Sequence, residues 1–244
     1  MEGRKMILFE GNISAGKSTL GKKLAEGGKF GFIEEPVSVW QNFRLDNGEV
    51  ENLLGIFYKD MHRWSFFFQM VAFATRAKTW DEILAWDNHQ MVALERSVFC
   101  DRNVFALNCF QSGLMERREW QAYCLIWDFI NSRHWCARPD LVVYVHTPAE
   151  TCYERMLEER GRPEETDITL AYLRALEKLH DDWLDSPVLP SGLCLINQQQ
   201  TPVLKLNGER PWATEELQEQ IEAHLPNRQL SLLEGIPSHP ANCA

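Results

Sequence analysis

The sequence has no run of about 18 uncharged apolar residues, and no short apolar block follows a basic start. A membrane-spanning helix and a secretory signal are therefore not expected. Only five residues precede the first apolar run, which is too few for a mitochondrial transit sequence. We expect a cytoplasmic protein that does not act at a membrane.

Glycine and proline are sparse, with 14 and 11 among 244 residues, which excludes a collagen-like or low-complexity chain. Nine Trp and 13 Phe argue against intrinsic disorder. The seven cysteines form no CxxC pair and no metal-site spacing, so we expect reduced and mostly buried thiols. The length and the 45% hydrophobic content fit a single large domain or at most two small ones.

Positive charge is in deficit, because 25 Lys and Arg stand against 35 Asp and Glu, for a net charge of −10. Affinity for DNA and RNA depends mostly on Lys and Arg at phosphates, so we expect no binding of a nucleic-acid polymer. A small phosphate ligand that is neutralised by Mg²⁺ remains compatible with this charge.

Short, continuous apolar runs alternate with longer stretches of helical spacing, which is clearest between residues 120 and 130. The apolar runs span residues 6–9, 32–33 with their neighbours, 91–94, 141–145 and, more weakly, 203–206. This alternation predicts an α/β fold with a parallel sheet that is covered by helices on both faces. We expect one domain over residues 1–225 and a loosely held or disordered tail over residues 226–244.

Residues 11–18 match the pattern GxxxxGK[ST] between a predicted strand and a predicted helix. In such a loop, backbone N–H groups surround phosphate oxygens at a helix start that favours anions. We expect Lys17 to contact the β- and γ-phosphates of a nucleotide and the Ser18 hydroxyl to ligate Mg²⁺. A glycine-rich turn with a chance GKS is the alternative, but the strand and helix around it favour phosphate binding. The predicted phosphate-binding residues are Gly11, Asn12, Ile13, Ser14, Ala15, Gly16, Lys17, Ser18 and Thr19.

Charged residues follow two further predicted strands. Glu35 comes after the second, and Glu95 and Arg96 come after the third. The carboxyl ends of parallel strands face the ligand crevice, where a carboxylate can accept a hydroxyl proton or hold Mg²⁺ and an arginine can stabilise a transferring phosphate. Taken alone, each set can also be a solvated surface pair. A phosphate loop by itself does not distinguish a GTPase, a motor, a nucleotide kinase and a nucleoside kinase.

Four motifs in order bear on that choice. They are Gly-Asn-Ile-Ser-Ala-Gly-Lys-Ser-Thr at 11–19, Glu-Pro-Val-x-x-Trp at 35–40, Arg-Trp-Ser-Phe-x-Phe-Gln at 63–69 and Glu-Arg-Ser-Val-x-x-Asp-Arg at 95–102. From about Ile7 to Leu206 the chain resembles the deoxyribonucleoside kinases. The resemblance implies a homodimeric P-loop kinase fold with a five-stranded parallel sheet and an arginine-rich lid at about 155–166. It also implies transfer of the γ-phosphate of ATP, or another nucleoside triphosphate, to the 5′-hydroxyl of a deoxynucleoside in nucleotide salvage.

The resemblance also assigns roles to residues. Glu35 is the implied base for the 5′-hydroxyl, Arg96 and Lys17 are implied catalytic partners, and Glu95 is expected to hold Mg²⁺ together with Ser18. The implied lid contacts to the donor are Arg155, Arg160 and Arg162, with one residue more than usual between Arg155 and Arg160. The implied substrate-binding residues are Glu35, Trp40, Tyr58, Gln69, Ala72, Arg76, Arg96, Asp101, Phe105 and Asp181.

Three of these positions bear on substrate choice. Arg76 and Asp101 match a pair in the deoxycytidine and deoxyguanosine kinases, and Ala72 also resembles the deoxycytidine enzyme. We therefore expect deoxycytidine and purine deoxynucleosides to be preferred over thymidine. At position 181 this chain has Asp where the family usually has a glutamate that holds the 3′-hydroxyl.

Two other readings remain open from the sequence. A non-catalytic structural subunit with the same fold would have no reason to keep all of Lys17, Ser18, Glu35, Glu95 and Arg96. A nucleoside monophosphate kinase would need additional cations for the acceptor phosphate, whereas the predicted pocket is aromatic and carries an amide.

Overall fold

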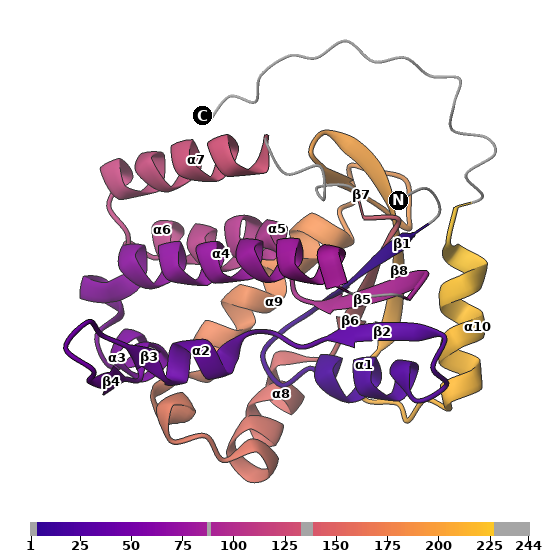
Figure 1. The fold of residues 1–244 in the computed structure, drawn as a ribbon, viewed down its shortest axis with the longest axis horizontal. Helices are drawn as coiled ribbons and strands as arrows, with labels where there is room; N and C mark the ends of the chain where they lie inside the picture. Colours follow the sequence, from indigo (N-terminus) through magenta and orange to yellow (C-terminus); the bar gives the residue numbers. More distant parts are fainter. Residues whose placement is uncertain (1–3, 87–88, 133–138, 227–244) are drawn as a thin grey trace.

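The computed structural model describes residues 4–86, 89–132 and 139–226 (Figure 1). Six strands form the central sheet, in the order β2-β5-β1-β6-β8-β7. Their bounds are Lys5–Glu10 for β1, Phe30–Ile33 for β2, Met91–Glu95 for β5, Leu141–His146 for β6, Leu193–Ile196 for β7 and Gln199–Asn207 for β8. The five apolar runs identified in the sequence all fall in these strands.

The sheet is parallel from β2 through β8, and β7 joins its edge antiparallel to β8. The expected α/β class is confirmed, but the expected count of five strands was wrong by one. The missed strand, β7, carries only four residues, and its residue Leu195 faces solvent. Because β7 is half exposed at a sheet edge, it lacks the continuous apolar pattern of a parallel strand that is buried on both faces.

Alternate residues of the strands pack into two separate cores, one on each face of the sheet. Leu8, Val92 and Val142 contribute to the first core, whereas Ile7 and Ala93 belong to the second. The first core is completed by helices α2 (Val37–Gln41), α3 (Leu53–Lys59), α4 (Met61–Trp86), α5 (Val98–Cys100), α6 (Leu107–Gln111) and α7 (Arg117–Asn131). The second core is completed by α1 (Lys17–Ala25), α8 (Ala149–Arg155), α9 (Leu170–Leu184) and α10 (Thr214–His224). Helices thus cover both faces, as the sequence predicted.

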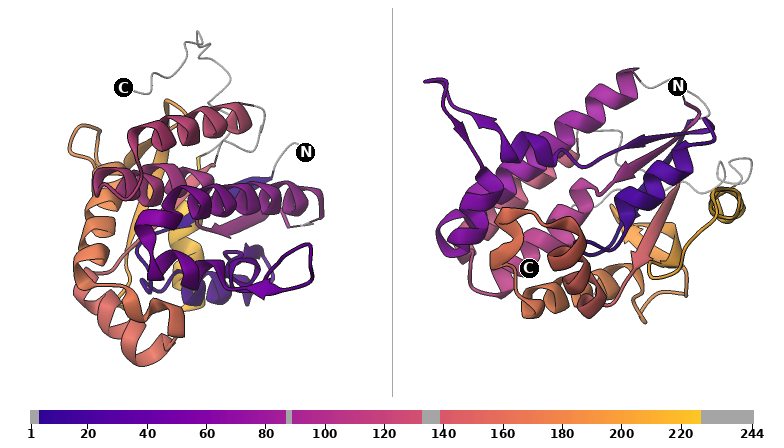
Figure 2. Two further views of the ribbon diagram at one scale, coloured as in Figure 1. Left: turned by 90° about the vertical axis from the view of Figure 1, so that its left-hand side faces the viewer. Right: turned by 90° about the horizontal axis from the view of Figure 1, so that it is seen from below.

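The remaining elements outside the central sheet and its helices are short. Strands β3 (Phe43–Arg44) and β4 (Val50–Glu51) form an antiparallel hairpin that projects from the rest of the ribbon (Figure 2). Two segments are π-helical, Asp101–Ala106 and Met156–Arg160, and Pro163–Asp167 is a 3₁₀ helix. The tail expected over residues 226–244 lies, except for Pro226, outside the described residues.

Within the described residues, no helix combines the length and the hydropathy that a membrane span requires.

Candidate active site

The loop between β1 and α1 has the backbone that the GxxxxGK[ST] pattern predicts. Gly11 and Gly16 both have positive φ, at 144° and 99°. A Cβ atom on Gly11 would lie 2.4 Å from the carbonyl oxygen of Val145, so only glycine fits against β6 there. Lys17 begins α1, and its Nζ donates to the carbonyl oxygen of Asn12 at 2.6 Å. The Lys17 side chain therefore bridges the two ends of the loop, and the N-terminus of α1 follows directly.

A large cavity opens beside this loop, with a volume of about 560 Å³. It is lined by Ser14, Ala15, Gly16, Lys17, Ser18, Thr19, Leu20, Lys23, Glu35, Glu95, Arg96, Arg155, Gly208, Arg210, Pro211 and Trp212. Of the predicted phosphate-binding residues, Gly11, Asn12 and Ile13 do not line it. Asn12 instead fixes the loop, because its Nδ2 donates to the carbonyl oxygen of Leu173 at 2.9 Å. We call this space the donor cavity.

Ser18 and Glu95 meet at the wall of the donor cavity. The Ser18 hydroxyl donates to Oε1 of Glu95 at 2.7 Å, and Glu95 is the last residue of β5. Mg²⁺ in nucleotide sites takes one or two protein oxygens and completes its octahedron with phosphates and water. A hydroxyl and a carboxylate side by side fit that requirement, although no larger cluster of metal-binding side chains occurs in the described ranges.

A second cavity, which we call the acceptor cavity, lies on the other side of Glu35 and has a volume of about 50 Å³. Its lining consists of Ile13, Glu35, Val37, Trp40, Leu54, Phe57, Tyr58, Phe68, Gln69, Ala72, Arg76, Arg96, Asp101, Phe105, Arg162, Glu165 and Tyr172. Glu35 and Arg96 line both cavities and therefore stand at their junction.

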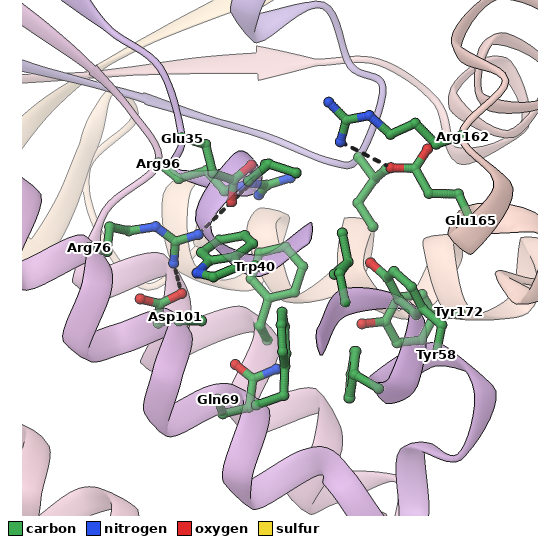
Figure 3. A pocket seen from close by; sticks show the side chains of 17 residues that line it. Glu35, Trp40, Tyr58, Gln69, Arg76, Arg96, Asp101, Arg162, Glu165 and Tyr172 are labelled. Carbon is green, nitrogen blue, oxygen red and sulfur yellow. Dashed lines mark hydrogen bonds and ion pairs between the residues drawn. The ribbon is translucent and has the colours of Figure 1, made fainter. Parts of the chain in front are cut away.

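Two arginines hold the Glu35 carboxylate (Figure 3). Arg76 pairs with it through Nη2, and Nε of Arg96 lies 3.2 Å from its Oε1. Arg76 also pairs with Asp101 through Nη1, so its guanidinium joins two carboxylates. Arg96 has a positive φ of 65°, which is rare outside glycine, and its Nη1 donates to the Gly11 carbonyl oxygen at 2.9 Å. Both arginines are almost fully buried.

One face of α4 forms the far wall of the acceptor cavity. Gln69, Ala72 and Arg76 lie three and four residues apart, which places them on one side of the helix. Oε1 of Gln69 is buried and has no hydrogen-bond partner among the described residues, whereas its Nε2 is 3.9 Å from Sγ of Cys109. An amide that both donates and accepts is thus available to a ligand. Trp40 closes this wall, with its ring edge on Phe68.

The opposite wall contains residues that the sequence analysis did not assign to the acceptor. Glu165 is buried, and its Oε1 lies 3.5 Å from Nη1 of Arg162. The Tyr172 ring packs edge-on against Tyr58, with ring centroids 6.4 Å apart. The Tyr172 hydroxyl has no hydrogen-bond partner in the described part of the chain. Arg162, expected at the donor phosphates, lines the acceptor cavity instead.

Asp181 does not line either cavity. It accepts a hydrogen bond from the Tyr144 hydroxyl at 2.8 Å and lies 4.0 Å from Nζ of Lys205, so it faces β6 and β8. Its neighbour His180 is the residue that points inward and is fully buried. One step along a helix rotates a side chain by about 100°, which accounts for the difference. Of the two carboxylates, Glu165 lines the acceptor cavity and Asp181 does not.

The extra residue noted between Arg155 and Arg160 falls in the π-helical segment Met156–Arg160, directly after α8. A π-helical turn holds one residue more than an α-helical turn, so it absorbs an insertion without ending the helix. Nη1 of Arg155 donates to the Gly208 carbonyl oxygen at 3.0 Å across the donor cavity. The side chain of Arg160 lies outside the described residues.

A buried acid lies directly behind this site. Glu10 ends β1 and is completely buried. Burial raises the pKa of Glu10 from 4.5 to about 7, although the Ser97 hydroxyl and the charge of Arg96 both oppose the rise. The folded chain therefore binds this proton more tightly than the unfolded chain.

This proton makes stability depend on pH in a defined direction. The stabilisation is fully present below about pH 4.5 and is lost as the pH rises through about 7. Glu10→Gln removes the titration, so relative to the variant the wild type should lose on the order of 3 kcal/mol of unfolding free energy across this window. Urea unfolding of both proteins across that range measures the difference. A constant difference between the two would contradict the assignment.

The chain was compared with known proteins. A family profile described as deoxynucleoside kinase matches residues 7–227. A probable deoxycytidine kinase of Fowlpox virus (strain NVSL) is 34% identical over 238 residues, which cover 97% of this chain and 88% of the relative. Deoxycytidine kinase of Homo sapiens is 33% identical over 83% of each chain. Mitochondrial thymidine kinase 2 of Homo sapiens is 33% identical over 75% of this chain and 65% of the relative. Because the profile spans most of the sequence and these identities exceed 30% over most of its length, the chain belongs to the deoxynucleoside kinase family.

Proposed function

We propose that this protein transfers the γ-phosphate of ATP to the 5′-hydroxyl of a deoxynucleoside and serves nucleotide salvage. One observation carries the proposal: Glu35 and Arg96 line both cavities. A triphosphate on the loop and a nucleoside in the aromatic cavity would meet at this pair. Catalysis of phosphoryl transfer is mainly positioning and charge stabilisation, and the two cavities supply the positioning.

In the proposed step the 5′-hydroxyl oxygen attacks the γ-phosphorus and its proton passes to Glu35. The bond between the γ-phosphorus and the β,γ-bridging oxygen breaks, and ADP leaves. Arg96 fixes Glu35 and faces the donor cavity, while Lys17 and Arg155 present positive charge to the donor phosphates. Mg²⁺ bound by the Ser18 and Glu95 oxygens would add positive charge at those phosphates. Tyr58 and Glu165 both line the acceptor cavity and would hydrogen-bond the 3′-hydroxyl of the sugar.

We further propose that deoxycytidine and purine deoxynucleosides are better acceptors than thymidine. One edge of the cavity is polar, because it carries the Arg76–Asp101 pair and the Gln69 Oε1 atom that has no hydrogen-bond partner in the described chain. This edge suits the amino and ring-nitrogen groups of cytosine and the purines. That polar edge leaves little apolar surface for the thymine methyl group.

The expected result is a higher kcat/KM for deoxycytidine, deoxyadenosine and deoxyguanosine than for thymidine, measured with ATP and Mg²⁺. A Lys17→Ala preparation, purified in the same way, measures the background rate of phosphorylation. A faster reaction with thymidine than with the other three would overturn the selectivity and leave the kinase assignment intact.

The charge of the acceptor cavity disfavours a nucleoside monophosphate as acceptor. Its arginines, Arg76, Arg96 and Arg162, stand against three carboxylates, those of Glu35, Asp101 and Glu165. The described lining thus has no excess positive charge for a dianionic phosphate. A purely structural role is disfavoured because Lys17, Ser18, Glu35, Glu95 and Arg96 all converge on one junction.

A homodimer and a cytoplasmic location are part of the same proposal. Helix α7 exposes Leu125 and Phe129, with 72% and 56% of their surfaces accessible, which supports a subunit contact there. Cys100, Cys109, Cys124, Cys152 and Cys194 are free and buried, as in proteins of reducing compartments. Sedimentation equilibrium tests the dimer, and microscopy of a tagged chain tests the location.

A further inference from the structure

Arg76 contacts both the carboxylate proposed as the catalytic base, Glu35, and the carboxylate proposed to recognise the nucleobase, Asp101. It extends from α4, and the two ends of its guanidinium pair with Glu35, after β2, and with Asp101, at the start of a π-helical segment (Figure 3). The arginine and Asp101 are both nearly inaccessible to solvent. The proposed proton acceptor and the proposed base-reading carboxylate are therefore joined through a single side chain.

The guanidinium has little freedom to move in this position. Its Cζ atom lies over the Trp40 ring, 5.2 Å from the ring centroid, and Trp40 is fixed in turn because its Nε1 donates to the Thr75 hydroxyl at 2.9 Å. The guanidinium is rigid and planar, so a shift at the Asp101 end also displaces the Glu35 end. A ligand that contacts Asp101 can consequently alter the position of Glu35.

We infer that Arg76 is a positioning residue for the catalytic base, which couples recognition of the nucleobase at Asp101 to the orientation of Glu35. This inference rests on the proposed kinase function and extends it. Arg76 would then govern how fast any bound acceptor reacts, in addition to which acceptor binds. A residue that only recognises the base would change the KM and the ranking of nucleosides but leave the maximal rate of a good acceptor unchanged.

Arg76 also contributes charge at Glu35. Of the groups around this carboxylate, Arg76 and Arg96 contact it directly. The other ionisable groups of the two cavities are Lys17, Lys23, Tyr58, Glu95, Asp101, Arg155, Arg162, Glu165, Tyr172 and Arg210. A cation in contact favours the ionised carboxylate, so loss of Arg76 should raise the pKa of Glu35.

Three variants test the inference by steady-state kinetics with deoxycytidine. Arg76→Gln should lower kcat by about 10- to 100-fold and should move the acid limb of the kcat/KM profile to higher pH. Arg76→Lys keeps the charge but lacks the rigid planar guanidinium that spans Glu35 and Asp101, so kcat should fall while the acid limb stays close to that of the wild type. Asp101→Asn should lower kcat in the wild-type background and have a much smaller effect on kcat when Arg76 is already Gln. Ionisation of the substrate is common to all variants and cancels in the comparison.

The controls separate this inference from protein folding and from the proposed function. Arg63→Gln makes the same charge change on the same helix at an exposed position outside both cavities, and it should leave kcat and the acid limb unchanged. Binding of a non-hydrolysable ATP analogue and thermal unfolding verify that each variant is folded. If Arg76→Gln raises KM but leaves both kcat and the acid limb of the kcat/KM profile unchanged, nucleobase recognition is not coupled to the orientation of Glu35. If the wild type phosphorylates no deoxynucleoside, the proposed function fails first.

Discussion

Replacing Glu35 with Gln is expected to lower kcat by about 10²–10⁴, the usual effect of losing a general base. Gln has nearly the same shape as Glu, and its one carbonyl oxygen can take the place of Oε1, which both Arg76 and Arg96 approach, so the cavity wall is preserved. The amide cannot take the proton of the attacking hydroxyl. Affinity for ATP should change little, because the donor phosphates are held by the loop and by Lys17 on the far side of the junction.

Single-turnover kinetics with saturating ATP and deoxycytidine measure this effect directly. Glu34→Gln is the matched control, because Glu34 is the adjacent carboxylate, is 55% exposed and pairs with Lys22 on the surface. The control should retain the wild-type rate. Equal rates for Glu35→Gln and the wild type would remove Glu35 from the proton-transfer step.

The sequence predicted the parts of the fold that follow from local pattern. The parallel strands are buried on both faces, which makes each one a continuous apolar run. The phosphate loop is equally local, since Gly11 and Gly16 are required by backbone geometry within one turn. The edge strand β7 and the hairpin β3–β4 were missed, because short, partly exposed strands carry no such run.

The acceptor cavity could be predicted only in part, because its residues come from six separate segments. Where a motif marks a position, as at Glu35, Gln69 and Arg96, the predicted residue lines the cavity. The prediction for position 181 followed the pattern of nearby residues, whereas the cavity receives Glu165, 16 residues earlier in the chain. The acidic pair at 164–165 was a usable signal, but sequence alone does not say which member points inward: Glu164 bonds to Gln41, and Glu165 faces the cavity.

Lys17→Ala is expected to lower kcat/KM for ATP by about 10²–10³, the cost of losing one strong charge partner of the transition state. Lys17 is buried, and its ammonium bonds to the loop's own Asn12 carbonyl in the structure. An ammonium group carries three N–H donors, so Lys17 can bond to the loop and to a donor phosphate at the same time. Alanine favours the helix, so the fold should be retained with a change in unfolding free energy within about 1 kcal/mol.

Donor-dependent thermal stability distinguishes a catalytic loop from a merely structural one. A ligand at 100 times its Kd stabilises the native state by about 2.7 kcal/mol, so ATP should raise the Tm of the wild type. The same ATP concentration should give a much smaller rise in Lys17→Ala. Lys22→Ala, which removes an exposed lysine of the same helix paired with Glu34, should respond to ATP as the wild type does. If ATP raised the Tm of Lys17→Ala as much as that of the wild type, the lysine would not contact the donor, and the loop would hold phosphate by its backbone alone.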